Sequence, residues 1–143
     1  MQRRFLGCLG GLLAALVWAW AAPPSFSHKK HAPLKMACVA CHATATSAER
    51  AGFPAVARCV TCHREMAKSL KPFSARLYKV ADFVFFSHAR HHAAAIVCVA
   101  CHGQVNQRDV LRRERPASMK ACIDCHKEHS ATIACTACHE LSQ

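Results

Sequence analysis

Ten cysteines of this chain occur in pairs separated by two residues, and a histidine follows each pair at once. In such a C-x-x-C-H unit the two thiols can form thioethers with the vinyl groups of a haem, and the adjacent imidazole can reach the iron. The five units, numbered here as motifs 1 to 5, occupy residues 38–42, 59–63, 98–102, 122–126 and 135–139. The predicted attachment cysteines are Cys38, Cys41, Cys59, Cys62, Cys98, Cys101, Cys122, Cys125, Cys135 and Cys138, and the predicted proximal iron ligands are His42, His63, His102, His126 and His139.

Other chemistries of paired cysteines explain this pattern less well. Disulfide bonds suit an exported chain, but they do not require a histidine after every second cysteine. Zinc sites use C-x-x-C pairs and likewise leave the adjacent histidine without a role. A thioredoxin-like motif would occur once, beside a βαβ pattern that this sequence lacks. The pattern therefore predicts five covalently bound haems of the c type as the cofactors of this chain.

Histidines outside the motifs supply enough second ligands for every iron. The chain has 11 histidines, so 11 − 5 = 6 remain. The segment FSHKKHAPLKMACVACH at 26–42 aligns without a gap on FSHARHHAAAIVCVACH at 86–102, which pairs the histidines of the two segments and leaves His92 opposite Ala32. We expect His92 to bind no iron, with the exchange of His91 and His92 as the open alternative. The predicted distal ligands are His28, His31, His88, His91 and His129.

The repeats divide the chain into two unequal parts. The segment 59–66 aligns on 122–129, where His129 stands in the place of Met66. Motif 5 occurs only in the second part, and so does His129, which suggests that this histidine serves motif 5. We predict a two-haem half at 22–78 and a three-haem half at 79–143.

The first 21 residues have the pattern of an export signal. Arg3 and Arg4 precede an apolar run at 5–20, and Ala19-Trp20-Ala21 provides a small-x-small cleavage site. An uncleaved membrane anchor is the alternative, since residues 5–22 are just long enough to cross a bilayer. Either form predicts a periplasmic protein or one at the outer face of the cytoplasmic membrane.

The composition excludes some partners and points to others. The formal net charge of +11 invites a nucleic-acid interpretation, but haem propionates would offset much of this charge, and exported haem-rich chains seldom meet nucleic acid. The remaining positive charge is consistent with a surface that docks an acidic redox protein. Aromatic residues make up only 7% of the chain, so the polypeptide alone would build a thin core. We therefore predict short α-helices around a core of haems, with little regular secondary structure.

The F-S-H-x-x-H segment a few residues before C-x-x-C-H resembles the class III multihaem cytochromes c, the cytochrome c3 and c7 group. The stretch DFVFFSHARHH with CVACHGQV is also similar to the pentahaem subunit of alternative complex III. The resemblance implies a bis-histidine haem fold in which the first histidine of each pair serves the next motif. It implies ligand pairs His28–His42, His88–His102, His31–His63, His91–His126 and His129–His139. The two-plus-three arrangement departs from a plain c3 or c7 protein.

Coordination predicts the function. Two imidazoles saturate an iron and leave no position for a substrate, so we expect an electron carrier rather than an enzyme. Its donor and acceptor would be redox proteins, and a membrane quinol-linked complex fits the resemblance. One alternative is a reductase of small oxyanions with one open haem, and another is an electron-wiring subunit of a membrane-bound oxidoreductase.

Overall fold

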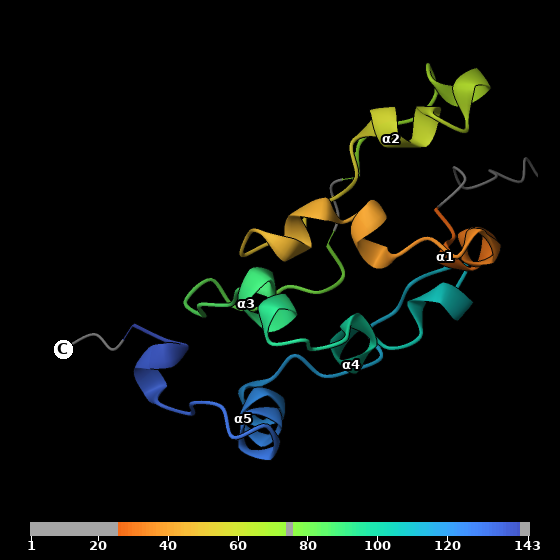
Figure 1. Cartoon of the computed structure of the whole chain (residues 1–143). Coiled ribbons are helices and arrows are strands. Elements are labelled where there is room, and N and C mark those ends of the chain that lie inside the picture. The colour runs from red at the N-terminus through yellow and green to blue at the C-terminus, as the bar shows by residue number, and fades with distance from the viewer. Residues whose placement is uncertain (1–25, 74–75, 141–143) are drawn as a thin grey trace, which may run out of the picture.

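The computed structural model describes residues 26–73 and 76–140, so the predicted export signal lies outside the described residues (Figure 1). The described chain consists of short helices joined by loops. Its α-helices are α1 (His28–His31), α2 (Val56–Val60), α3 (His88–Ala93), α4 (Cys98–His102) and α5 (Met119–Glu128). Its 3-10 helices are η1 (Ala32–Leu34), η2 (Cys38–Ala40), η3 (Ala43–Thr46), η4 (Arg64–Met66), η5 (Val105–Gln107) and η6 (Cys135–Ala137). Among the described residues β pairing is limited to one antiparallel bridge, between Val84 and His139.

Helices α1 and α3 begin in the same way because the repeat places the same residues at their start. The hydroxyls of Ser27 and Ser87 accept hydrogen bonds from the third backbone N–H of each helix, at 3.1 and 3.3 Å. The preceding Phe26 packs against His28 and His31, with ring centroids 4.8 and 4.5 Å apart. Phe86 packs in the same way against the two histidines of α3. The repeated spacing of this segment thus places two imidazoles beside one aromatic ring within one helical turn.

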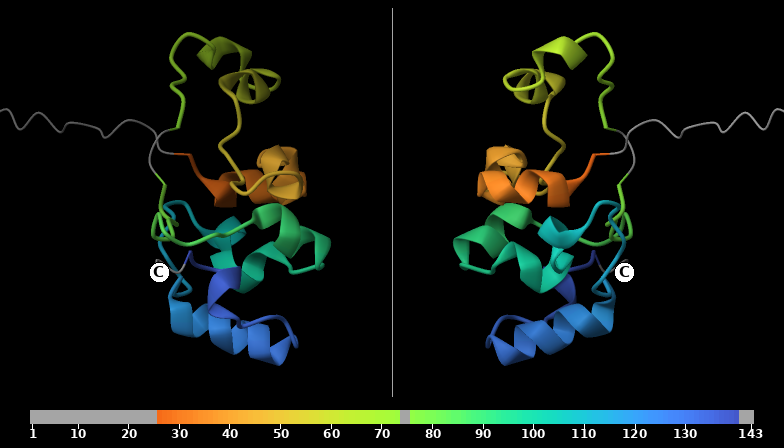
Figure 2. Two further views of the ribbon diagram at one scale, coloured as in Figure 1. Left: turned by 90° about the vertical axis from the view of Figure 1, so that its left-hand side faces the viewer. Right: turned by 90° about the vertical axis from the view of Figure 1, so that its right-hand side faces the viewer.

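The two halves dock on each other reciprocally. At the start of α1, Lys29 N–H donates to the Arg108 carbonyl in the other half at 3.0 Å. At the start of α3, Ala89 N–H donates to the Ala48 carbonyl at 3.0 Å. The two donors are sixty residues apart in the sequence, and so are the two acceptors. In each half, the helix that carries the two predicted distal ligands (α1 or α3, named here the histidine helix) therefore contacts the loop after the first motif of the other half. Figure 2 shows the resulting stack, with α2 at one end, α1 and α3 in the middle and α5 at the other end.

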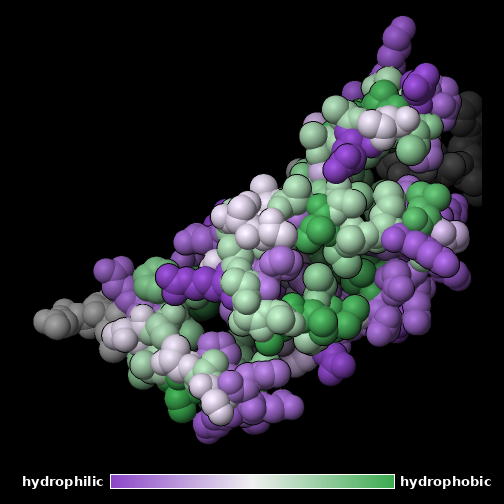
Figure 3. All heavy atoms as spheres, viewed as in Figure 1, coloured by the Kyte–Doolittle hydropathy of each residue, from purple (hydrophilic) through white to green (hydrophobic). Residues whose placement is uncertain are grey.

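The polypeptide has no hydrophobic core of its own in the part that the structure describes, where no apolar side chain is buried. Large apolar side chains lie open instead, among them Phe83 at 70% exposure and Val110 at 72%. Figure 3 shows apolar residues scattered between polar ones over the surface in view. A chain of this kind needs another apolar group in its interior, and porphyrins would supply it.

Local expectations from the sequence were met unevenly. The sequence predicts short helices beside the motifs at 43–50, 65–70 and 127–130, and an isolated short strand within 77–86. The first two helices are present only as the 3-10 turns η3 and η4, and of 127–130 only residues 127 and 128 are helical, at the end of the longer α5. The strand prediction is wrong, since only the bridge at Val84 is formed in this stretch. Across the described residues, none of the helices has both the length and the apolar character needed to cross a bilayer.

Candidate haem-binding sites

Four of the five motif histidines lie opposite a second imidazole. The ring centroids are 6.4 Å apart for His28 and His42, and 6.2 Å apart for His88 and His102. In both pairs the two rings are inclined by only 10°. A metal–imidazole nitrogen bond is about 2 Å long, so two imidazoles on opposite sides of one iron have centroids roughly 6 Å apart. These spacings have the size that one iron between the rings requires.

The second motif of each half shows the same spacing with a different inclination. His31 and His63 have ring centroids 6.0 Å apart with planes at 62°, and His91 and His126 have centroids 6.1 Å apart with planes at 45°. The two histidines of each histidine helix therefore face different motifs. The first histidine faces motif 1 in α1 and motif 3 in α3, and the second faces motif 2 in α1 and motif 4 in α3.

Hydrogen bonds orient most of these imidazoles through one nitrogen. A carbonyl oxygen can only accept, so an Nδ1 beside it carries the proton and Nε2 is left as a metal ligand. His31 Nδ1 donates to the Ser27 carbonyl and His91 Nδ1 to the Ser87 carbonyl, both at 2.8 Å. The further pairs of this type are His42 with Gly52 (3.0 Å), His88 with Glu49 (2.7 Å), His126 with Thr132 (2.6 Å) and His139 with Phe83 (3.3 Å).

Three predicted or candidate ligands stand outside this arrangement. No second histidine ring faces His139 in the described chain, where the nearest ring is that of Phe83 at 5.6 Å. His129 ends α5 and is exposed, and His92 is exposed on α3. Neither has an aromatic or histidine ring beside it among the described residues. The pairing of His129 with His139 therefore stays a prediction without a contact to support it.

Burial shapes the electrostatics of the two central sites. Burial lowers the pKa of His102, and the nearby rings of His88 and His42 lower it further. The pKa of His28 is lowered in the same way, first by burial and then by His42 and His31. His28 Nδ1 is buried without a hydrogen-bond partner. Low pKa values keep these rings neutral, which is the state that binds iron.

All ten motif cysteines are free thiols in the structure. The described residues contain no group of three or more side chains that would hold a zinc ion or another metal without haem. Neighbouring thiols show which motifs adjoin. Burial raises the pKa of the Cys38 thiol, and the Cys98 thiol beside it raises it further.

Two further thiols extend this order through the second half. Burial raises the pKa of Cys101, and the nearby thiols of Cys125 and Cys122 raise it further, so motif 3 adjoins motif 4. Burial also raises the pKa of Cys122, and the nearby thiol of Cys138 raises it further, so motif 4 adjoins motif 5. At the other end, Arg58 Nε donates to the Ala40 carbonyl at 2.9 Å and ties motif 2 to motif 1.

These features fit covalently attached haem. The attachment thiols are free and at least partly exposed, the paired imidazoles have the spacing of an iron between them, and their Nδ1 atoms are mostly taken up by carbonyls. A hollow of about 220 Å³ beside Cys41, lined by Ala43, Phe53 and Pro54, offers an apolar wall next to motif 1. Sequence reasoning did not identify the carbonyls of Glu49, Gly52 and Thr132, because any residue type can supply a carbonyl.

Comparison with known proteins agrees with this chemistry. No curated protein matches the chain. The family model described as cytochrome c3 matches residues 30–111, which are 82 of the 143 residues and include motifs 1, 2 and 3. The match covers more than half of the chain and contains two complete imidazole pairs, His31 with His63 and His88 with His102. The chain therefore belongs to the cytochrome c3 family, the class III multihaem cytochromes c.

Proposed function

We propose that this multihaem cytochrome holds five covalent haems and carries electrons between redox proteins in the periplasm. The family supports covalent c-type haem and electron transfer. Bound haem supplies one-electron chemistry at its iron. The four imidazole pairs carry the proposal, because two histidines on one iron leave no position for a substrate and hold the same geometry in both redox states. The count of five rests on the five C-x-x-C-H motifs.

The order of the motifs in space suggests an electron path that does not follow the chain. Motifs 1 and 3 adjoin through Cys38 and Cys98, and reciprocal hydrogen bonds hold α1 and α3 at this junction. Motif 2 lies beyond motif 1, and motifs 4 and 5 lie beyond motif 3. We infer a path in the order 2, 1, 3, 4, 5, which crosses between the halves once.

The ends of this path are the natural places for partners. Around motif 2 the exposed side chains of Arg64, Lys68 and Lys71 have no acidic partner among the described residues. A basic surface of this kind favours an acidic redox protein by electrostatic attraction. A quinol-linked complex at the outer face of the cytoplasmic membrane remains a second form of partner, and the N-terminal 21 residues would export the chain to either.

The intact mass of the purified holoprotein tests the haem count and the export signal together. We expect a mass equal to residues 22–143 plus five haems. Visible and EPR spectra should show low-spin iron at motifs 1 to 4 in both redox states. A mass with fewer than five haems would contradict the central proposal, and a mass that includes residues 1–21 would support the anchor.

One observation favours a second function at motif 5. His139 is the motif histidine that faces no second imidazole in the described chain, so its haem is the candidate for an open iron. Carbon monoxide added to the reduced holoprotein distinguishes the two functions. Binding of about one equivalent would support a small-oxyanion reductase, whereas the absence of binding would place a sixth ligand, with His129 as the expected one, on this iron too.

A further inference from the structure

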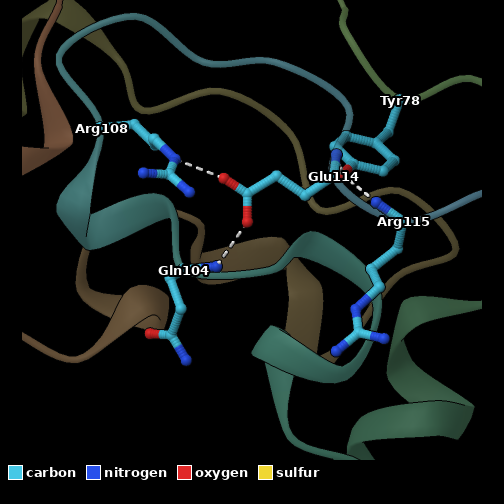
Figure 4. A network of polar contacts seen from close by, with 5 residues as sticks. All are labelled: Tyr78, Gln104, Arg108, Glu114 and Arg115. Atoms are coloured by element: carbon cyan, nitrogen blue, oxygen red, sulfur yellow. Dashed lines mark hydrogen bonds and ion pairs between the residues drawn. The ribbon is translucent and has the colours of Figure 1, made fainter.

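A cluster of polar residues surrounds the chain just after motif 3 (Figure 4). The Glu114 carboxylate accepts from the Gln104 backbone N–H at 3.0 Å and from the Arg108 guanidinium. Glu114 N–H in turn donates to the Tyr78 hydroxyl at 2.9 Å. We name these four residues the Glu114 cluster. Three of its members come from the segment 104–114, and Tyr78 lies 36 residues before Glu114.

The Glu114 cluster contacts the iron-ligating part of motif 3 at two points. The Tyr78 ring lies edge-on to the His102 ring, with centroids 4.7 Å apart. Glu114 packs against Gly103, the residue that directly follows His102. Gly103 is buried with φ at +69°, and a side chain there would collide with Glu114. The cluster therefore contacts the ring of the proximal ligand and the backbone that directly follows this ligand.

The charges of the cluster are better shielded from water than those of other ion pairs. The side chains of Glu114 and Arg108 are 16% and 32% exposed, whereas both members of every other ion pair in the described residues are at least 44% exposed. Shielded charges act more strongly on a nearby centre because water and salt screen them less.

The described part of the first half has no equivalent of this cluster. At the sixty-residue offset of motifs 1 and 3, Thr44 occupies the place of Gln104 and Ala48 that of Arg108. Glu114 falls opposite Pro54 at this offset, or opposite Ala51 at the sixty-three-residue offset of motifs 2 and 4. His42 instead donates through Nδ1 to the Gly52 carbonyl. Motifs 1 and 3 therefore have similar imidazole pairs, each inclined by 10°, but different surroundings.

We propose that the Glu114 cluster positions His102 and sets the reduction potential of the haem at motif 3. The inference rests on the proposed haem attachment at that motif. Ferric haem carries one more positive charge than ferrous haem, so a nearby carboxylate favours the ferric form and a nearby guanidinium the ferrous form. The cluster makes two otherwise equivalent sites electrically different at the junction between the halves.

Opposite charge changes in the holoprotein test this proposal. Glu114→Gln should raise the potential of the motif 3 haem and Arg108→Gln should lower it, each changing its ferric-to-ferrous ratio at a fixed applied potential by about tenfold (~59 mV for one electron). Potentiometric titration followed by EPR measures the shifts, and a Cys98→Ser/Cys101→Ser variant identifies the component. Asp82→Asn is the matched control, because Asp82 is exposed and pairs with Lys79 outside the cluster. It should leave this component unchanged.

The positioning role has its own readout. Tyr78→Ala should alter the EPR signal of the motif 3 haem, because the ring beside His102 is lost. Tyr78→Phe keeps that ring and should restore the signal. Shifts of the same sign in Glu114→Gln and Arg108→Gln, or no shift in either, would overturn the proposal. Intact mass is measured first for each protein, since a wild type without haem at motif 3 would contradict the proposed function instead.

Discussion

Single histidines acquire their roles from the hydrogen bond at Nδ1 and from the ring that they face. In α3, His91 donates through Nδ1 to the Ser87 carbonyl and faces His126, whereas its neighbour His92 is exposed. Adjacent residues of a helix point in directions about 100° apart, so the two imidazoles cannot exchange places without rotating the helix. The same Nδ1 bond recurs at His31 in α1. The second histidine of each helix is thereby aimed at a different motif from the first.

Substitution of the two adjacent histidines tests their assignment. His91→Ala should leave the motif 4 iron with one protein ligand, produce a high-spin ferric signal of about one haem equivalent and admit carbon monoxide after reduction. His92→Ala should retain the wild-type visible and EPR spectra. High-spin haem in the His92 variant together with an unchanged His91 variant would reverse the assignment and show that the sixty-residue repeat misidentifies the ligand.

At the scale of the secondary-structure elements, the short helices depend on their N-caps and on hydrogen bonds to the other half of the chain. Helices α1 and α3 have four and six residues, too few to be stable alone in water. Serine caps supply one partner for each helix start, and backbone bonds to the opposite half supply another. Ser27 makes one more hydrogen bond than Ser87, because its buried hydroxyl also donates to the Asp109 carboxylate at 2.8 Å. The α1 cap thus forms part of the contact between the halves.

The two caps provide a matched pair of variants. Ser87→Ala should lower the free energy of unfolding by about 1 kcal/mol, the usual effect of losing an N-cap. Ser27→Ala should lower it more, because the bond to Asp109 is lost as well. Thermal unfolding of the ferric holoprotein measures both. In an Asp109→Ala background the two serine substitutions should become equal, and equal effects in the wild-type background would show that the Asp109 bond adds nothing.

At the scale of the whole molecule, the described residues form no hydrophobic interior from side chains alone. No apolar side chain is buried in the described residues, while Leu34, Phe83 and Met119 are at least 60% exposed. Folding free energy comes mainly from buried apolar surface, so this chain must obtain it from its cofactors. Attachment of haem and folding of the polypeptide are therefore expected to be one process.

The coupling of folding to haem is tested on the chain without its cofactors. Apoprotein produced without haem attachment should show a weak helical circular dichroism signal and no cooperative thermal transition. The holoprotein should show both. A cooperative transition in the apoprotein would mean that the short helices and their hydrogen bonds suffice for a stable fold.

Local chemistry in the sequence identified the candidate cofactor sites. Cys-x-x-Cys-His needs only adjacent residues, and F-S-H-x-x-H needs one helical turn, so both patterns could be recognised from spacing alone and led to the family. The imidazole pairs of four motifs also followed from the repeat and the resemblance, and the structure brings those rings together. Only the tertiary structure decided the reciprocal docking of the halves, the contact of motif 1 with motif 3, and the Glu114 cluster. The docking contacts and the bond of Glu114 to Tyr78 join residues dozens of positions apart, through backbone carbonyls, a single tyrosine and one glutamate among arginines. Such residues carry no periodic or motif signal until folding places them side by side.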